Sequence, residues 1–160
     1  MFYKNHELKD RENGFTLIEI LLVIGIIAIL AAVVIVAINP ARQFAQARNS
    51  QRLSNVNTIL NAVYQYAVDN TGILPSAITA STTEICKTGI ATSSCAAANL
   101  INLSVLTTNE IYIVSLPLDP SCPLACATDG IGYTIIKSAN GRITVAAPDA
   151  ELSVTVSVTK

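Results

Sequence analysis

One carboxylate stands at the start of the longest apolar stretch of the chain. Between Phe15 and Ile38 the only charged side chain is Glu19, and the only other polar side chain is Thr16. A carboxylate in a membrane-spanning helix costs about 3 kcal/mol at the bilayer centre and less near its edge. Glu19 lies near the N-terminal end of the run, where a lone chain tolerates it. In a packed bundle of helices, however, Glu19 needs a positively charged partner.

The four cysteines are the second group of residues with chemistry to offer, and all lie beyond the apolar stretch. We expect sequence neighbours to pair, Cys86 with Cys95 and Cys122 with Cys126, which closes two short surface loops. Four cysteines allow three pairings, so pairing across the two loops stays open. Zinc is the alternative, but Cys86 and Cys95 are too widely spaced for the usual knuckles, and the only histidine is His6.

The other polar residues form no catalytic pattern. No histidine follows the apolar stretch, no serine nucleophile motif is present, and the carboxylates are scattered. Asp119 and Asp129 flank the second cysteine loop, but Asp119-Pro120 and Asp129-Gly130 are ordinary turn formers. We therefore expect no enzyme activity, no cofactor and no metal site.

The apolar stretch itself predicts a membrane-spanning helix. Residues 20–38 contain no charge and no proline, and as a helix they reach roughly the 30 Å of a hydrocarbon core. The segment is apolar on every face, whereas a surface helix shows only a stripe. A buried core helix is the weaker interpretation, because no other segment of the chain is able to cover all of its sides.

The start of this stretch resembles a known family. Gly14-Phe15-Thr16-Leu17-Ile18-Glu19 followed by the apolar run is similar to the N-terminal motif of type IV pilins and type II secretion pseudopilins. The resemblance is close over residues 14–38 and weaker beyond. It implies that a membrane prepilin peptidase cuts after Gly14 and methylates the new N-terminal residue, Phe15. It also implies that Glu19 is the assembly residue, with the free amine of Phe15 as its partner.

The resemblance also implies partners and a location. The partners are further copies of the chain or other pilins and pseudopilins, the prepilin peptidase, and an assembly ATPase with its inner-membrane platform. The leader lies in the cytoplasm and the remainder outside, first anchored in the bacterial inner membrane and then in an extracellular filament. Charge does not decide this orientation, because three basic residues precede the stretch and three follow it closely. They are Lys4, Lys9 and Arg11 on one side and Arg42, Arg48 and Arg52 on the other.

Two other features of the family bear on the C-terminal half. Leu116-Pro117-Leu118-Asp119-Pro120 resembles a turn of major pseudopilins and their pilin relatives. Related pseudopilins hold calcium in this region, but we favour plain turns at Asp119 and Asp129. The net charge of −1 offers no basic surface, so we predict no direct binding of nucleic acid.

A secretory signal peptide is the competing interpretation of the N-terminus. Ala45-Gln46-Ala47 has the form of a cleavage site. The apolar region, however, is about twice the usual length of ~7–15 residues, and the leader is neutral. The cleavage-like triplet also falls within a segment that reads as continuous helix, so we reject this interpretation.

A second helix follows Asn39-Pro40, which interrupts the first. Asn39 is able to cap the new helix with Pro40 at its first position, and Gly72 and Pro75 end it. Arginines on this helix are expected to face solvent or neighbouring subunits. The predicted inward stripe comprises Leu53, Val56, Leu60, Val63 and Ala67, broadened by Ile59 and Tyr66.

The remainder reads as loop followed by strands. We predict a loop over 76–99, a short helix or strand over 100–106 and a strand over 111–114. Asn140-Gly141 between two β-branched runs predicts a hairpin of 133–137 with 142–145. Residues 152–158 alternate with period two, which predicts a strand with Leu152, Val154, Val156 and Val158 inward.

Together these patterns predict an α+β, pilin-like fold. A long N-terminal helix, membrane-spanning in its first half and amphipathic in its second, packs on a small antiparallel sheet of about three strands. The expected function is a structural filament subunit of a type IV pilus. The alternatives are a type II secretion pseudopilin and, in another class, a single-pass anchor that displays a small binding domain. The expected organisation is a leader (1–14), a transmembrane and filament-core helix (15–38), an amphipathic helix (39–70) and a disulfide-stapled loop and β-sheet domain (71–160).

Overall fold

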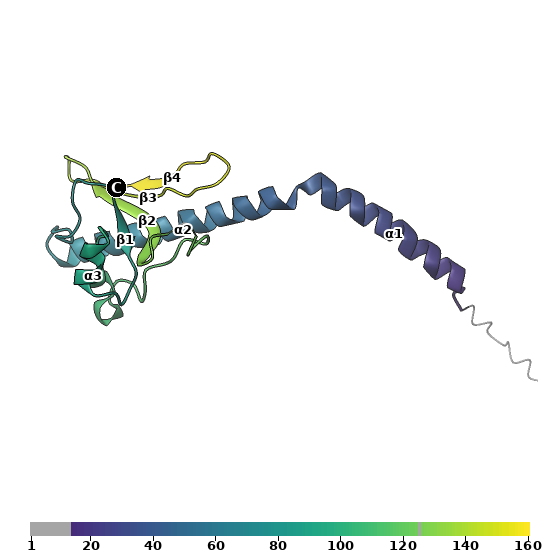
Figure 1. Cartoon of the computed structure of the whole chain (residues 1–160), viewed down its shortest axis with the longest axis horizontal. Helices are drawn as coiled ribbons and strands as arrows, with labels where there is room; N and C mark the ends of the chain where they lie inside the picture. The colour runs from purple at the N-terminus through teal and green to yellow at the C-terminus, as the bar shows by residue number, and fades with distance from the viewer. Residues whose placement is uncertain (1–13, 125) are drawn as a thin grey trace, which may run out of the picture. The chain divides into compact units, whose positions relative to one another are not determined.

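The computed structural model describes residues 14–124 and 126–160. Residues 1–13 of the expected leader lie outside the described residues. The chain divides into two compact units, the first ending at Pro40 and the second starting at Ala41. In chain order the elements are α1 (Leu17–Ile38), α2 (Pro40–Asp69), β1 (Thr83–Cys86), α3 (Thr92–Ala97), η1 (Ser104–Leu106), η2 (Thr108–Glu110), β2 (Gly130–Lys137), β3 (Ile143–Ala147) and β4 (Val156–Thr159) (Figure 1).

The described part of the first unit, residues 14–40, contains the helix α1. The helix ends at Asn39, whose φ of 46° is left-handed, a conformation that asparagine tolerates better than most residues. Pro40 then occupies the first position of α2, where its missing N–H has no consequence. No residue of α1 is buried.

One face of α2 forms half of the core of the second unit. Val56, Ile59, Leu60 and Val63 are fully buried, as the helical spacing predicts. Leu53 was expected inward but is 47% exposed, so this part of the predicted stripe is wrong. Arg52 takes the buried position on that turn, and the next residue along a helix points about 100° away.

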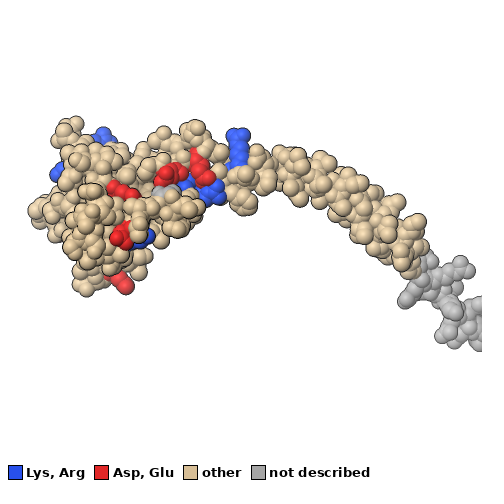
Figure 2. Space-filling model, in the orientation of Figure 1, with Lys and Arg blue, Asp and Glu red and all other residues tan. Residues whose placement is uncertain are grey.

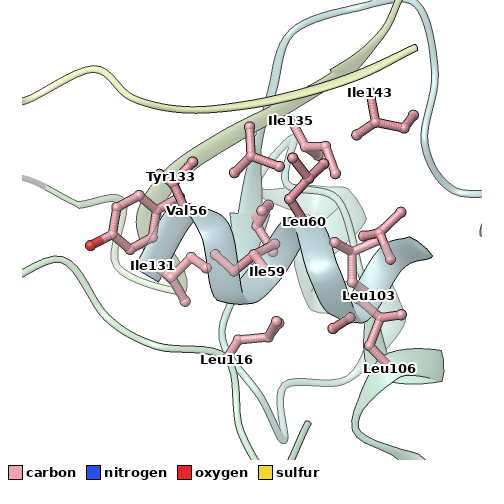
Figure 3. Packing of buried hydrophobic residues seen from close by; sticks show 14 of the residues in the cluster. Val56, Ile59, Leu60, Leu103, Leu106, Leu116, Ile131, Tyr133, Ile135 and Ile143 are labelled. Carbon is pink, nitrogen blue, oxygen red and sulfur yellow. The ribbon is translucent and has the colours of Figure 1, made fainter. Parts of the chain in front are cut away.

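The other half of the core comes from the sheet and from the segment before it. The sheet has the order β1-β2-β3-β4 with every pair antiparallel. Figure 3 shows its side chains packed against α2 together with those of the loop region. The α+β class is therefore confirmed, with four strands rather than about three. The partners of α2 in this core include Leu103, Leu106, Leu116, Ile131, Tyr133, Ile135 and Ile143.

The predicted hairpin is confirmed at β2 and β3. Lys137 lies opposite Ile143 in the register, and Gly141 has a φ of 81°. Only glycine adopts such an angle without strain. The β2 strand begins at Gly130, three residues earlier than the pattern predicts.

The expected loop over 76–99 is wrong in two places, because β1 and α3 lie within it. β1 is only four residues long, too short for an alternating pattern to show. α3 is a six-residue helix that includes the buried, disulfide-bonded Cys95. Of the predicted short element over 100–106, the structure has the three-residue helix η1.

The predicted strand over 111–114 is absent from the structure. Ile111 and Val114 are exposed, and Tyr112 packs edge-on against Tyr66 with ring centroids 5.6 Å apart. Strand formation needs a neighbouring edge as well as suitable residues. Beside β1 that edge is partly taken by Ile101, which bridges Ile85.

The last predicted strand is shorter than expected. β4 begins at Val156, whereas Leu152 and Val154 are 46% and 50% exposed and not inward. The residue before them, Glu151, is bonded to α2. Because Glu151 is held against α2, the chain pairs with β3 only from Val156 onward.

Candidate assembly site

The residues of the N-terminal motif lie on either side of the start of α1. Gly14 and Phe15 are exposed and precede the helix. Thr16 caps it, because its side-chain Oγ1 accepts a hydrogen bond from the backbone N–H of Glu19 at 3.2 Å. Glu19 is the acidic residue of the first turn, where a carboxylate interacts favourably with the helix dipole. The Gly14–Phe15 bond thus lies just before the helix, and Glu19 lies in the first turn of the helix.

The helix behind this motif is long and apolar enough to cross a membrane. Leu17–Ile38 has 22 residues and a mean hydropathy of 3.4 over its best 18-residue window. At 1.5 Å per residue it is about 33 Å long. It is the one such helix in the part of the chain that the structure describes.

A buried ion pair that the sequence analysis missed lies on α2. Arg52 was expected to face solvent or a neighbour, but its side chain is fully buried, so that expectation is wrong. Its Nε donates to Oδ2 of Asp119 at 2.7 Å, and its Nη2 donates to Oδ1 of Asp119 at 3.0 Å and to Oγ of Ser121 at 2.7 Å. The hydrogen bonds from Arg52 to Asp119 raise the pKa of the guanidinium further. One signal could have found it, since Arg52 lies one turn before Val56 on the inward stripe.

Glu151 extends this ion pair to a second loop. Its carboxylate accepts from Nε and Nη2 of Arg48 at 2.7 and 2.6 Å, and from Nη1 of Arg52 at 3.0 Å. Asn49 donates to the carbonyl of Glu151 and accepts from its N–H, at 2.8 and 3.0 Å. The hydrogen bonds from Arg48, followed by those from Arg52, lower the pKa of Glu151 from 4.5 to about 2.

These contacts fasten two loops to α2. The turn at Asp119 and the β3–β4 loop at Glu151 both attach to the stretch between Arg48 and Arg52. Figure 2 shows basic and acidic side chains gathered beside α2, whereas the visible face of α1 carries no charge. The carboxylate of Asp119 accepts from Arg52 and also, through Oδ1, from the backbone N–H of Ser121 at 2.8 Å, so it joins its own turn to α2.

The cysteines pair as sequence neighbours. Cys86 and Cys95 form a disulfide with a Cα–Cα distance of 5.9 Å, and Cys122 and Cys126 form the second. Within residues 14–124 and 126–160, no group of three or more His, Cys, Asp or Glu side chains is placed to hold a metal ion.

Comparison with known proteins bears on the N-terminal motif. The family model of the prokaryotic N-terminal methylation motif matches residues 9–35. No curated protein and no solved structure matches the chain. The matched residues include the Gly14–Phe15 bond, Glu19 and most of the exposed apolar helix. The chain therefore carries the prokaryotic N-terminal methylation motif, which is the signature of type IV pilins and pseudopilins.

Proposed function

We propose that this chain is a structural subunit of a type IV pilus-like filament. It is cut after Gly14 by a prepilin peptidase and methylated on the new N-terminal Phe15. Helix α1 then holds it in the inner membrane until an assembly ATPase and its membrane platform add it to a filament. The methylation motif at residues 9–35 supports the processing steps.

The apolar surface of α1 carries the assembly step. The helix has 22 residues, and none of them is buried. Burial of apolar surface stabilises by about 25 cal/mol per Å², so an uncovered helix of this kind is strongly unfavourable in water. The bilayer covers it before assembly. In a filament outside the cell, the helices of other copies are the apolar surface available.

Glu19 supports polymerisation over permanent anchoring. In a bundle of apolar helices its carboxylate has no water and needs a positive partner. Cutting after Gly14 creates a free amine on Phe15, and the amine of a neighbouring copy provides that partner. A permanent single-pass anchor needs neither the cut nor the carboxylate.

A type II secretion pseudopilin is the second candidate. The turn Leu116-Pro117-Leu118-Asp119-Pro120 favours it, because this turn resembles one found in major pseudopilins. In such a system the same subunit plan forms a short filament that drives protein export. Visible surface filaments favour the pilus, and genes for an export system beside this one favour the pseudopilus.

Mass spectrometry of the N-terminus tests the proposal, applied to sheared surface material and to membranes. We expect a chain that begins at N-methyl-Phe15 in the sheared fraction. A chain that begins at Met1 and stays in the membrane would identify a simple anchor. A chain that begins at Arg48 would identify a signal peptide, although Ala45 and Arg48 both lie within α2.

The Glu19→Ala variant tests the role of the carboxylate. We expect normal amounts in the membrane, because the helix becomes more apolar, and loss of the chain from the sheared fraction. Glu19→Asp keeps the charge and is the matched control for partial function. Unchanged sheared material from Glu19→Ala would contradict the assembly role.

A further inference from the structure

The second unit has a groove between the last turns of α2 and the segment that follows η2. Its volume is about 500 Å³. All of its lining residues belong to the second unit, and none of them takes part in the ion pairs of Arg48 and Arg52. The groove is therefore separate from the N-terminal motif and from the buried ion pair. Its lining comprises Asn61, Tyr64, Gln65, Val68 and Asp69 of α2 together with Ile111 and Tyr112.

The walls of the groove are apolar and partly uncovered. Val68 is 79% exposed and Ile111 is 62% exposed, whereas both tyrosines are half-buried and held by contacts. The hydroxyl of Tyr64 donates to a backbone carbonyl just beyond β4, and the ring of Tyr112 packs edge-on against Tyr66. Two fixed aromatic rings beside two open aliphatic side chains suit the apolar part of a ligand.

The backbone that leads into one wall of the groove is strained. Asn109 and Glu110, directly before Ile111 and Tyr112, have φ angles of 54° and 56°. Asparagine tolerates this left-handed region, but glutamate does so far less readily. Strain of this kind gathers at ligand sites and persists only where the surroundings hold it. The strained segment therefore supports a functional role for this wall.

Asp69 makes one end of the groove negative. Of the described residues that line the groove, Asp69 carries the one charge, and the salt bridges among described residues leave it without a basic partner. It is also the last residue of α2, whose last turn contains no basic residue, although the C-terminus of a helix favours cations. Burial, followed by the charge of Asp69, raises the pKa of Tyr112, so its hydroxyl lies near the carboxylate. A cation at this end compensates the carboxylate and the helix terminus together.

The opposite end of the groove already holds a lysine of the chain itself. Nζ of Lys160 donates to Oδ1 of Asn61 at 2.8 Å, so the open acceptor is at the Asp69 end. Asn61 lies eight residues before Asp69 on α2, which is about 12 Å along the helix. At roughly 3.3 Å per residue, an extended peptide of about four residues covers this distance. The length and the volume thus fit a short peptide segment rather than a single small ion.

We propose that this groove binds a short basic segment of a partner protein, with a lysine side chain placed on Asp69. The four-carbon stem of the lysine lies along Val68 and the tyrosine rings, and its ammonium meets the Asp69 carboxylate. The faces of the two rings add cation–π attraction. This inference goes beyond the proposed function and does not depend on it, because binding at the groove requires neither cleavage after Gly14 nor a filament.

Titration of the ¹⁵N-labelled full chain in a non-ionic detergent tests the proposal by NMR. The probe is a blocked four-residue peptide with one lysine among small and apolar residues. The matched control peptide contains Nε-acetyl-lysine, which keeps the stem but removes the charge. We expect the amide signals of residues 68–70 and 111–113 to shift, and the acetylated peptide to bind about fivefold more weakly, as for loss of an exposed ion pair. Added salt should weaken the binding of the lysine peptide alone.

The Asp69→Asn variant locates the charge that is recognised. It keeps the shape of the groove, so we expect about fivefold weaker binding of the lysine peptide and unchanged binding of the acetylated one. Asp149→Asn is the matched control, because Asp149 is exposed and does not line the groove, and it should bind both peptides as the wild type does. The comparison of the two peptides uses the wild-type chain, so it stands even if Asp69→Asn does not fold.

Three results would overturn the inference. They are equal affinity of the wild-type chain for the two peptides, signal shifts confined to residues outside the groove, and binding of free glucose at the groove in place of either peptide. None of them alters the N-terminal mass that tests the proposed function. A chain that begins at Met1 would likewise leave the peptide titration unaffected, so the two proposals fail separately.

Discussion

Arg52 and Asp119 form a fully buried ion pair. Removing one member of such a pair lowers stability far more than replacing both members with apolar groups. Both side chains are inaccessible to solvent, so each charge depends on the other for compensation. Replacing such a pair with apolar groups of similar size is often nearly neutral. Removing one member alone leaves an uncompensated buried charge.

We therefore expect Asp119→Ala to lower the free energy of unfolding by about 3 kcal/mol, near the lower end of the range for broken buried pairs. The lower end applies because Glu151 still contacts Arg52. Urea unfolding of the full chain in detergent, followed by tyrosine fluorescence, measures the change. The double variant Arg52→Met with Asp119→Leu should recover most of the loss. Asp149→Ala, at an exposed position, should change stability little, and an equal loss there would contradict the role of the pair.

Glu151 makes stability depend on pH in a defined window. Hydrogen bonds from Arg48 lower its pKa from 4.5 to about 2 in the folded chain. Because the folded pKa lies below the unfolded pKa, the stabilisation is complete above pH 4.5 and is lost as the pH falls toward 2. We expect the melting temperature to fall across this window. Glu151→Gln should melt lower at neutral pH and show a smaller dependence on pH. A slope identical to that of the wild type would exclude Glu151 as its source.

In the β3–β4 loop, the backbone conformation that the tertiary contacts hold is one that the residues of the loop disfavour. Ser153 has a φ of 57°, and the left-handed region costs an L-residue roughly 1–2 kcal/mol. Glycine adopts this angle without such a cost. We expect Ser153→Gly to raise the free energy of unfolding by about 1 kcal/mol, measured by urea unfolding. Ser157→Gly makes the same change within the extended strand β4 and should lower stability by about 0.5–1 kcal/mol. If both variants are destabilised, the turn is not strained.

The elements that the sequence predicts well are those whose pattern is long or whose turn is distinctive. α1 is apolar over its whole length apart from Glu19, and the β2–β3 hairpin has Asn140-Gly141 at its turn. β1 was missed because its four residues carry too little pattern, and its place is fixed by pairing with β2. The strand expected at 111–114 had suitable residues, but the edge beside β1 is partly taken by Ile101 and residues 111–114 do not join the sheet. Such outcomes depend on neighbours that are distant in the sequence.

The residues of the candidate site also differ in how far the sequence reveals them. The Gly14–Phe15 bond and Glu19 are recognisable from the sequence because the motif is contiguous. Arg52, Asp119 and Glu151 are separated by as many as 99 residues, and nothing in their local sequences links them. Only the position of Arg52 on the inward stripe of α2 pointed to a buried partner. Its carboxylate partners, Asp119 and Glu151, are brought to Arg52 only by the tertiary fold.

At the scale of the whole molecule, the folded core and the surface that we propose for assembly lie in different parts of the chain. Every described core residue lies between Ala45 and Val156, and both disulfides lie in the same unit. No residue of α1 is buried. The second unit thus contains all of the described burial that stabilises it, whereas α1 exposes the apolar surface that we propose meets the membrane and then other copies.

A chain shortened to residues 41–160 should therefore fold on its own. We expect it to be soluble without detergent, with both disulfides formed and a urea midpoint close to that of the full chain, because no core residue is lost. It should not enter membranes or filaments, because the apolar helix is gone. Size-exclusion chromatography and urea unfolding measure these properties, and the Asp119→Ala change in the short chain is the control for a specifically packed core. An unfolded short chain would show that α1 supports the domain, which would contradict the division of folding and assembly between the two units.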